Sequence, residues 1–153
     1  MSTARAIADV TEGVIVATVD IGVSPERVFH ALTSEEITKW WVRPGVFDTR
    51  EWSGDVRVGG KWRASGIGNG NPYALEGEFT EIDPPHKLVH TWLPVGRPMP
   101  PSVVSYTLEK IEGGTRLTLR HSGIAAPAMF ENTSVGWQAS FEALIELLSA
   151  EAT

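Results

Sequence analysis

The last part of the chain is predicted to form a strongly one-sided helix, and it follows an almost continuous series of strands. With 100° per residue, the segment 134–149 has one polar face and an opposite face that divides into a bulky strip and a strip of small residues. Such a helix needs an apolar surface to cover, and the predicted sheet supplies it. The two strips side by side predict a cavity between helix and sheet. The bulky residues are Trp137, Phe141, Leu144 and Leu148, and the small ones are Gly136, Ser140 and Ala143.

The segments before this helix are mostly strand-like. Residues 14–21 alternate between apolar and polar, which is typical of a half-buried strand. Ser24-Pro25 then predicts the start of a short helix, and the capping-box pattern at 33–36 predicts a second one that runs through Trp40-Trp41. Short connections between the later strands favour an antiparallel meander over parallel crossovers. These strands are predicted at about 46–53, 60–66, 73–82, 87–93, 102–110 and 114–122.

Strand parity predicts which side chains face the helix, because alternate residues of a strand point to one face. Leu88 and Trp92 bracket His90, and the apolar side of 115–122 includes His121. Each histidine is open to three interpretations: a hydrogen-bonded core residue, a group that orients a polar ligand, or an acid/base catalyst. The candidate ligand-binding residues are Trp62, Leu75, Phe79, His90, Trp92, Tyr106, His121, Trp137 and Phe141.

Composition excludes several classes of function. The chain has no cysteine, so thiolate nucleophiles, disulfides and thiolate zinc sites are ruled out. Its formal net charge of −6 argues against a nucleic-acid partner. No apolar run approaches the ~20 residues of a membrane span, and the N-terminus does not resemble a signal peptide. We therefore expect a cytoplasmic protein of one domain over 1–153, with its core at about 14–149 and no membrane span.

No cofactor or metal is expected either. The glycine-rich segment 66–70 resembles a phosphate loop, but such a loop needs a helix directly after it. Asn71-Pro72 and a strand follow instead, so we predict a hairpin turn. The two inner-face histidines lie on different strands without a carboxylate at ligand-like spacing, which gives a metal site little support.

Several motifs, in order along nearly the whole chain, resemble the START-like (SRPBCC, helix-grip) superfamily, in the branch homologous to the activator of the 90-kDa heat-shock protein ATPase. The resemblance implies an α+β helix-grip fold: a curved antiparallel sheet of about seven strands, two short helices after the first strand, and a long C-terminal helix packed across the sheet. It also implies a pocket for an apolar ligand. The motifs are Val23-Ser24-Pro25-Glu26-Arg27-Val28-Phe29-His30-Ala31-Leu32-Thr33, Trp40-Trp41, Val58-Gly59-Gly60-Lys61-Trp62, Gly77-Glu78-Phe79-Thr80-Glu81-Ile82-Asp83-Pro84-Pro85, Leu88-Val89-His90-Thr91-Trp92, the segment 114–123, and Gly136-Trp137.

Three hypotheses for function follow. The first is a non-catalytic protein that binds a small hydrophobic or amphipathic molecule between sheet and C-terminal helix. The second is an enzyme like the polyketide cyclases and dehydratases, with His90, His121 or Tyr106 as acid/base groups. The third is a module that interacts with a chaperone or regulator through an exposed apolar patch. The sequence leaves homodimer formation open.

Overall fold

The computed structural model describes residues 5–9, 13–43, 45–96, 100–124 and 127–149, and gives no side-chain description for residues 5, 8, 9 and 127–132. The described residues form nine strands and three helices. The strands are β1 Arg5–Asp9, β2 Val14–Ile21, β3 Val42–Arg43, β4 Phe47–Gly54, β5 Lys61–Gly68, β6 Asn71–Asp83, β7 Lys87–Pro94, β8 Ser102–Ile111 and β9 Gly114–Ser122. The helices are α1 Pro25–Leu32, α2 Ile37–Trp40 and α3 Pro127–Ser149.

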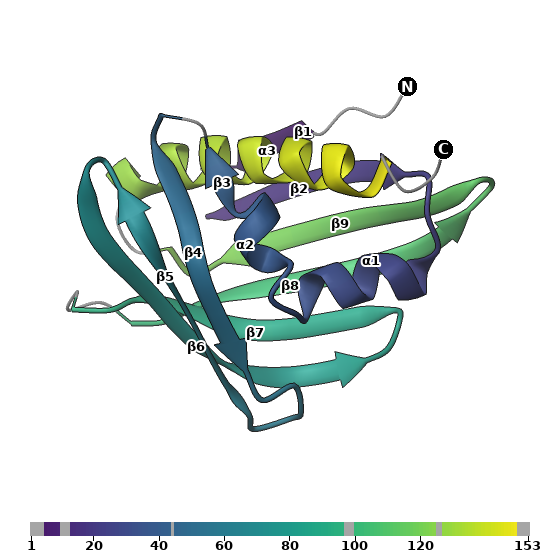
Figure 1. Cartoon of the computed structure of the whole chain (residues 1–153), viewed down its shortest axis with the longest axis horizontal. Coiled ribbons are helices and arrows are strands. Elements are labelled where there is room, and N and C mark those ends of the chain that lie inside the picture. Colours follow the sequence, from purple (N-terminus) through teal and green to yellow (C-terminus); the bar gives the residue numbers. More distant parts are fainter. Residues whose placement is uncertain (1–4, 10–12, 44, 97–99, 125–126, 150–153) are drawn as a thin grey trace.

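All nine strands belong to one antiparallel sheet in the order β1-β2-β9-β8-β7-β6-β5-β4-β3. The sheet curls so far that both of its edges contact α3 (Figure 1). One edge contributes β1 and β2, and the other contributes β3. This arrangement confirms the helix-grip α+β fold. The two strands beyond the predicted seven, β1 and β3, are the edge strands of the sheet.

The turns follow the glycine pattern of the sequence. Asn69 and Gly70 both have positive φ, 51° and 80°, and they join β5 to β6. Two residues with positive φ give the backbone twist that a two-residue hairpin needs, and Asn-Gly is a preferred pair for it. The glycine-rich segment 66–70 is therefore a hairpin, as predicted.

The two short helices differ in how they begin. Ser24 caps α1, since its side chain accepts a hydrogen bond from the Arg27 backbone N–H at 3.3 Å, and Pro25 occupies the first helical position. The predicted capping box at 33–36 is wrong, because the N-cap of α2 is Glu36 and makes no side-chain cap bond. The Glu36 carboxylate instead accepts two hydrogen bonds of 2.6 Å from the Arg27 guanidinium. This ion pair ties the start of α2 to α1.

Helix α3 begins at Pro127, seven residues before the predicted start at 134. Proline suits a helix start because it has no backbone N–H of its own to leave unpaired. The polar residues 131–133 hide this part of the helix from a pattern based on apolar spacing. The bulky strip is buried as predicted. Part of the small strip is covered: Ser140 is buried, and a Cβ added to Gly136 would contact Phe47 of β4 at 3.6 Å.

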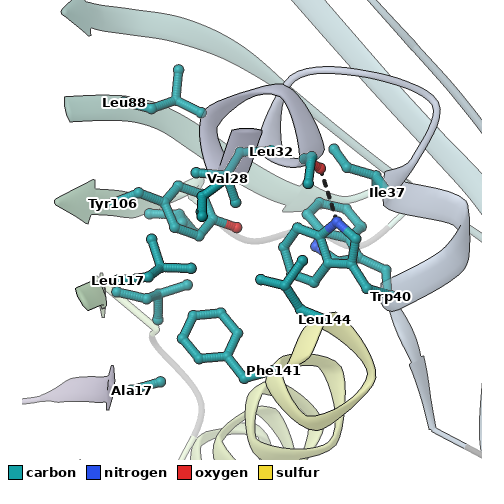
Figure 2. Packing of buried hydrophobic residues seen from close by; sticks show 14 of the residues in the cluster. Ala17, Val28, Leu32, Ile37, Trp40, Leu88, Tyr106, Leu117, Phe141 and Leu144 are labelled. Atoms are coloured by element: carbon teal, nitrogen blue, oxygen red, sulfur yellow. Dashed lines mark hydrogen bonds between the residues drawn. The ribbon is translucent and has the colours of Figure 1, made fainter. Parts of the chain in front are cut away.

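Between α3 and the sheet, the apolar side chains of the sheet and the short helices form one continuous core (Figure 2). Leu88, Tyr106 and Leu117 rise from three strands, while α1 contributes residues such as Val28. The buried indole of Trp40 donates to the Ala31 carbonyl at 2.8 Å, which anchors α2 on α1. The short helices therefore close one end of the space between sheet and α3.

The sheet is interrupted between β6 and β7 near Gly77. Glu76 pairs with Leu93, and the next backbone pair is Phe79 with His90. Between these two pairs, side chains supply the hydrogen bonds that link the strands. The Trp62 indole N–H donates to the Thr91 carbonyl at 3.2 Å, and the Thr91 hydroxyl accepts from the Glu78 N–H at 2.9 Å. The indole can reach Thr91 only because Gly77 has no side chain.

Replacing Gly77 with alanine is expected to lower the free energy of unfolding by about 2–4 kcal/mol. The new Cβ would overlap the Thr91 carbonyl oxygen and the Trp62 indole nitrogen, so both the strand spacing and their hydrogen bond would be lost. Gly68→Ala is the control, since its Cβ would meet side chains and no backbone atom: the Tyr73 ring at 3.3 Å and the Phe47 side chain at 3.8 Å. Urea unfolding of the two variants measures the difference, and equal losses would contradict this role for Gly77.

Candidate ligand-binding interior

The residues predicted to bind a ligand come together on the inner face, meaning the side of the sheet that faces α3. Seven of the nine are buried, and Leu75 and Trp92 are partly exposed but pack against the core. Their rings form an edge-to-face chain, in which Trp62 lies 5.0 Å from His90 and Trp92 lies 4.9 Å from His121, between ring centroids. The chain continues from His90 to Tyr106 by a tilted contact, and then edge-to-face through Trp137 to Phe141, with Phe79 beside His90. We call this set, together with Trp41, the aromatic cluster.

His121 holds α3 against the sheet through hydrogen bonds at both ring nitrogens. The Trp137 indole N–H donates to Nδ1 at 3.0 Å, so Nδ1 carries no proton. The proton is therefore on Nε2, which donates to the Ser102 hydroxyl at 2.7 Å. Ser102 donates in turn to the Trp92 carbonyl at 3.0 Å. His121 is therefore neutral, with both ring nitrogens hydrogen-bonded. Its bonds connect β7, β8 and β9 to α3.

His90 has a different environment, because only one of its ring nitrogens is bonded. Nδ1 donates to the Thr91 carbonyl at 2.8 Å, and that oxygen also accepts from Trp62. Nε2 is then a bare acceptor, and no described residue donates a hydrogen bond to it. The ring is nonetheless only 4% exposed and is surrounded by Trp62, Phe79 and Tyr106.

Both inner-face histidines are uncharged at neutral pH. Burial lowers the pKa of His90 to about 4, although its bond to the Thr91 carbonyl opposes the shift. Burial also lowers the pKa of His121 to about 3, and the nearby His90 lowers it further. Neither ring can serve as a ready proton donor at pH 7, so the interior offers hydrogen bonds and not charge.

Trp41 belongs to this site although it is absent from the predicted set. Adjacent residues of a helix point in different directions, which predicts one tryptophan of the pair 40–41 inside and the other at the pocket edge. Both are buried, at 0% and 5% exposure. The Trp41 ring lies 5.6 Å from Trp62 and 6.0 Å from Trp137. Ser102 is the second residue that was missed, and its inner-face parity with Val104 and Tyr106 was the available signal.

The polar atom of Trp41 has no partner. Its buried indole N–H makes no hydrogen bond within the part of the chain that the structure describes. Burial raises the pKa of the Tyr106 hydroxyl far above its usual range, and an interaction with the Trp41 indole N–H opposes the rise. The two groups therefore lie close together, but they do not reach the geometry of a formed hydrogen bond. A buried donor left unpaired costs about 1–3 kcal/mol.

The two neighbouring tryptophans therefore give a matched test. We expect Trp40→Phe to destabilise the fold by about 1–3 kcal/mol more than Trp41→Phe, since only the first leaves an acceptor, the Ala31 carbonyl, without its donor. Both substitutions remove a similar part of a buried ring. Chemical unfolding followed by circular dichroism would measure the two variants, and an equal or reversed order would contradict the assignment.

A separate groove of about 660 Å³ lies on the outer face of the sheet, where β6 and β7 separate. Opposite charges flank it: Lys61 on β5 pairs with Glu78 on β6 at 2.8 Å, and both side chains are largely exposed. Strand parity places these residues away from α3. The groove is thus distinct from the aromatic cluster, and Trp62 is the one residue that the two share. Its lining consists of Ser53, Lys61, Trp62, Arg63, Glu76, Gly77, Glu78, Thr91, Leu93 and Pro101.

Two other kinds of site were sought in the described ranges. No group of three or more His, Cys, Asp or Glu side chains lies close enough there to hold a metal ion. No helix among the described residues is long and apolar enough to cross a membrane.

A curled antiparallel sheet around a C-terminal helix, with an aromatic inner face, defines a helix-grip protein of the START-like superfamily. The sequence matches the family described as "Activator of Hsp90 ATPase homolog 1-like protein" over residues 22–149, and the chain belongs to that family. Comparison with curated proteins finds no match.

Solved structures share this fold. Protein CV1439 from Chromobacterium violaceum has a TM-score of 0.80 and 25% identity, over 89% of this chain and 96% of its own. Protein Ms6760 from Mycobacterium smegmatis has a TM-score of 0.81 and 22% identity, over 97% and 96%. CalU16 from Micromonospora echinospora has a TM-score of 0.63 and 22% identity, over 99% and 87%. The last two show likeness of fold alone.

Proposed function

We propose that this protein binds a small hydrophobic or amphipathic molecule between the inner face of the sheet and α3. The observation that carries the proposal is the unpaired indole N–H of Trp41, buried inside the aromatic cluster. An apolar side chain in its place would avoid the cost of an unpaired donor, so stability alone does not account for it. A bound molecule with a hydrogen-bond acceptor would offset that cost.

Two further features support binding. Trp92 and Leu75 lie on the inner face, pack against the core and remain partly exposed, so they offer an apolar approach to the aromatic cluster. Pockets for small molecules are generally lined by apolar and aromatic side chains with a few polar groups that fix orientation. The inner face has this composition, with His90, Tyr106 and Trp41 as the polar points.

The geometry favours binding over acid/base catalysis. Both nitrogens of His121 are engaged in hydrogen bonds, and His90 is a weak base because burial lowers its pKa to about 4. A catalytic base is most effective when its pKa lies near the working pH. The enzyme hypothesis therefore depends on a single atom, Nε2 of His90.

Native mass spectrometry of the full chain, with a thermal-shift screen of neutral aromatic compounds, tests the proposal. We expect a small-molecule adduct or a compound that raises the melting temperature. Ala143→Phe, which adds bulk to the partly buried small strip of α3, should weaken binding by about tenfold or more, equivalent to about 1.4 kcal/mol. Glu146→Phe on the exposed face of α3 is the control and should leave binding unchanged. No adduct and no stabilising compound, or equal binding by Ala143→Phe and the native chain, would overturn it.

A further inference from the structure

Three polar groups in the aromatic cluster keep hydrogen-bonding capacity. The buried Trp41 indole N–H, which can only donate, has no partner among the described residues. Nε2 of His90, whose Nδ1 is bonded to the Thr91 carbonyl, can only accept, and the Tyr106 hydroxyl, which Trp41 approaches, can both donate and accept. Their side chains are 5%, 4% and 1% exposed. Figure 2 shows the Tyr106 hydroxyl pointing away from β8 toward the side of Trp40 and Leu144.

These three groups lie around one place. The His90 ring is 5.9 Å from the Tyr106 ring, and Trp41 acts directly on the Tyr106 hydroxyl. The Trp62 ring contacts both Trp41 and His90, at centroid distances of 5.6 Å and 5.0 Å. The donor and the acceptor are therefore held on the same side of the core, with apolar rings around them.

The residues around these three groups also determine which ligand charge can bind there. The described residues of the inner face include no lysine or arginine among the buried side chains. Burial keeps His90 and Tyr106 uncharged at neutral pH. A carboxylate placed here would lose its hydration without gaining an opposite charge, which is strongly unfavourable.

We infer that Trp41, His90 and Tyr106 form a polar subsite that binds the neutral hydroxyl group of an aromatic ligand. The hydroxyl oxygen accepts from the Trp41 N–H, and its hydrogen is donated to Nε2 of His90, while the Tyr106 hydroxyl completes the set. The ligand's ring packs among Trp62, Trp137 and Phe79. This inference rests on the proposed function and gives the class of ligand: phenols and aromatic alcohols, in preference to carboxylates and to plain hydrocarbons.

Three compounds with one ring system test the preference: 2-naphthol, 2-methylnaphthalene and 2-naphthoate. The methyl group matches the hydroxyl in size but makes no hydrogen bonds, and the carboxylate adds a charge. Calorimetric titration of the full chain at pH 7 should give 2-naphthol about tenfold tighter binding than either of the others, as expected for hydrogen bonds to buried groups. Equal dissociation constants for 2-naphthol and 2-methylnaphthalene would overturn the subsite.

Substitutions in the subsite test whether its polar groups cause the preference for 2-naphthol. Trp41→Phe and Tyr106→Phe each remove one polar group and keep an aromatic ring, and each should weaken 2-naphthol binding by about three- to tenfold. Both should weaken 2-methylnaphthalene binding less than 2-naphthol binding, because the hydrocarbon makes no hydrogen bond to the groups that are removed. Trp52→Phe is the matched control, since Trp52 is a buried tryptophan of β4 that lies over Gly54 and outside the described ring contacts of the cluster. Thermal melts confirm that each variant is folded before titration.

The possible results separate the two levels of the proposal. If Trp41→Phe and Tyr106→Phe weaken both compounds alike, the subsite is wrong while ligand binding in the interior stands. If none of the three compounds binds, or if Ala143→Phe leaves every affinity unchanged, the proposed function fails and the subsite with it. If 2-naphthol binding weakens more than 2-methylnaphthalene binding in Trp41→Phe and Tyr106→Phe, and not in Trp52→Phe, both are supported.

Discussion

His121→Leu is expected to lower the free energy of unfolding by about 2–4 kcal/mol at pH 7. Leucine fills most of the ring's volume, so the loss comes mainly from hydrogen bonds. The substitution leaves the Trp137 indole N–H buried without an acceptor and removes the donor to Ser102. Ser102 keeps its own bond to the Trp92 carbonyl, so Trp137 carries most of the penalty.

His90→Leu is the matched control for this substitution. His90 is also buried, but its one partner, the Thr91 carbonyl, keeps a second hydrogen bond from Trp62. No group is orphaned, and we expect a loss of about 1 kcal/mol. Adding Trp137→Phe to His121→Leu should recover part of the lost stability, since it removes the unpaired donor. Urea unfolding of the native chain, His121→Leu, Trp137→Phe and the double variant measures the coupling, and strictly additive losses would show that the His121–Trp137 bond contributes nothing.

The stability of the protein is expected to fall steeply as the pH decreases from about 6.5 to about 4. Burial lowers the pKa of His90 to about 4 and that of His121 to about 3, whereas both titrate near about 6.5 in the unfolded chain. Below pH 6.5 the unfolded state therefore binds more protons than the folded state. The stabilisation that is fully present above this pH is lost as the two rings are protonated on unfolding.

The slope of that loss gives the measurement. Each histidine contributes up to about 1.4 kcal/mol per pH unit, so unfolding free energies at pH 7, 6 and 5 should approach a combined slope of about 2.7 kcal/mol per unit. His90→Leu should remove about half of it. A free energy of unfolding that stays constant between pH 7 and pH 5 would show that the two rings are not buried in their neutral form.

Strand parity predicted much of the inner face before any long-range contact was known. His90, Tyr106 and His121 follow directly from alternation in β7, β8 and β9, because the period of a strand is two and one face is buried. The long helix was found for the same reason, through its bulky strip. These signals are local, and local periodicity is what sequence shows best.

The parts that were missed depend on contacts between distant segments. Strand β1 is short and its centre is Ala6-Ile7-Ala8, which gives little alternation of its own, and it forms by pairing with β2. The Ala6 backbone N–H also donates to the Gln138 side chain, 132 residues away. The bond between His121 and Trp137 and the unpaired N–H of Trp41 likewise appear only once α3 and α2 have packed on the sheet.

The indole N–H signals of the tryptophans test the central claim most directly. Trp40, Trp62 and Trp137 already donate inside the protein, to Ala31, Thr91 and His121, whereas Trp41 donates to no described residue. In a proton–nitrogen correlation spectrum of the full chain titrated with 2-naphthol, the Trp41 indole signal should move downfield and saturate, and the signal of Trp40, whose N–H is bonded to the Ala31 carbonyl, should move much less. A titration that leaves the Trp41 signal in place, or that shifts only outer-groove residues such as Leu93, would contradict ligand binding between sheet and α3.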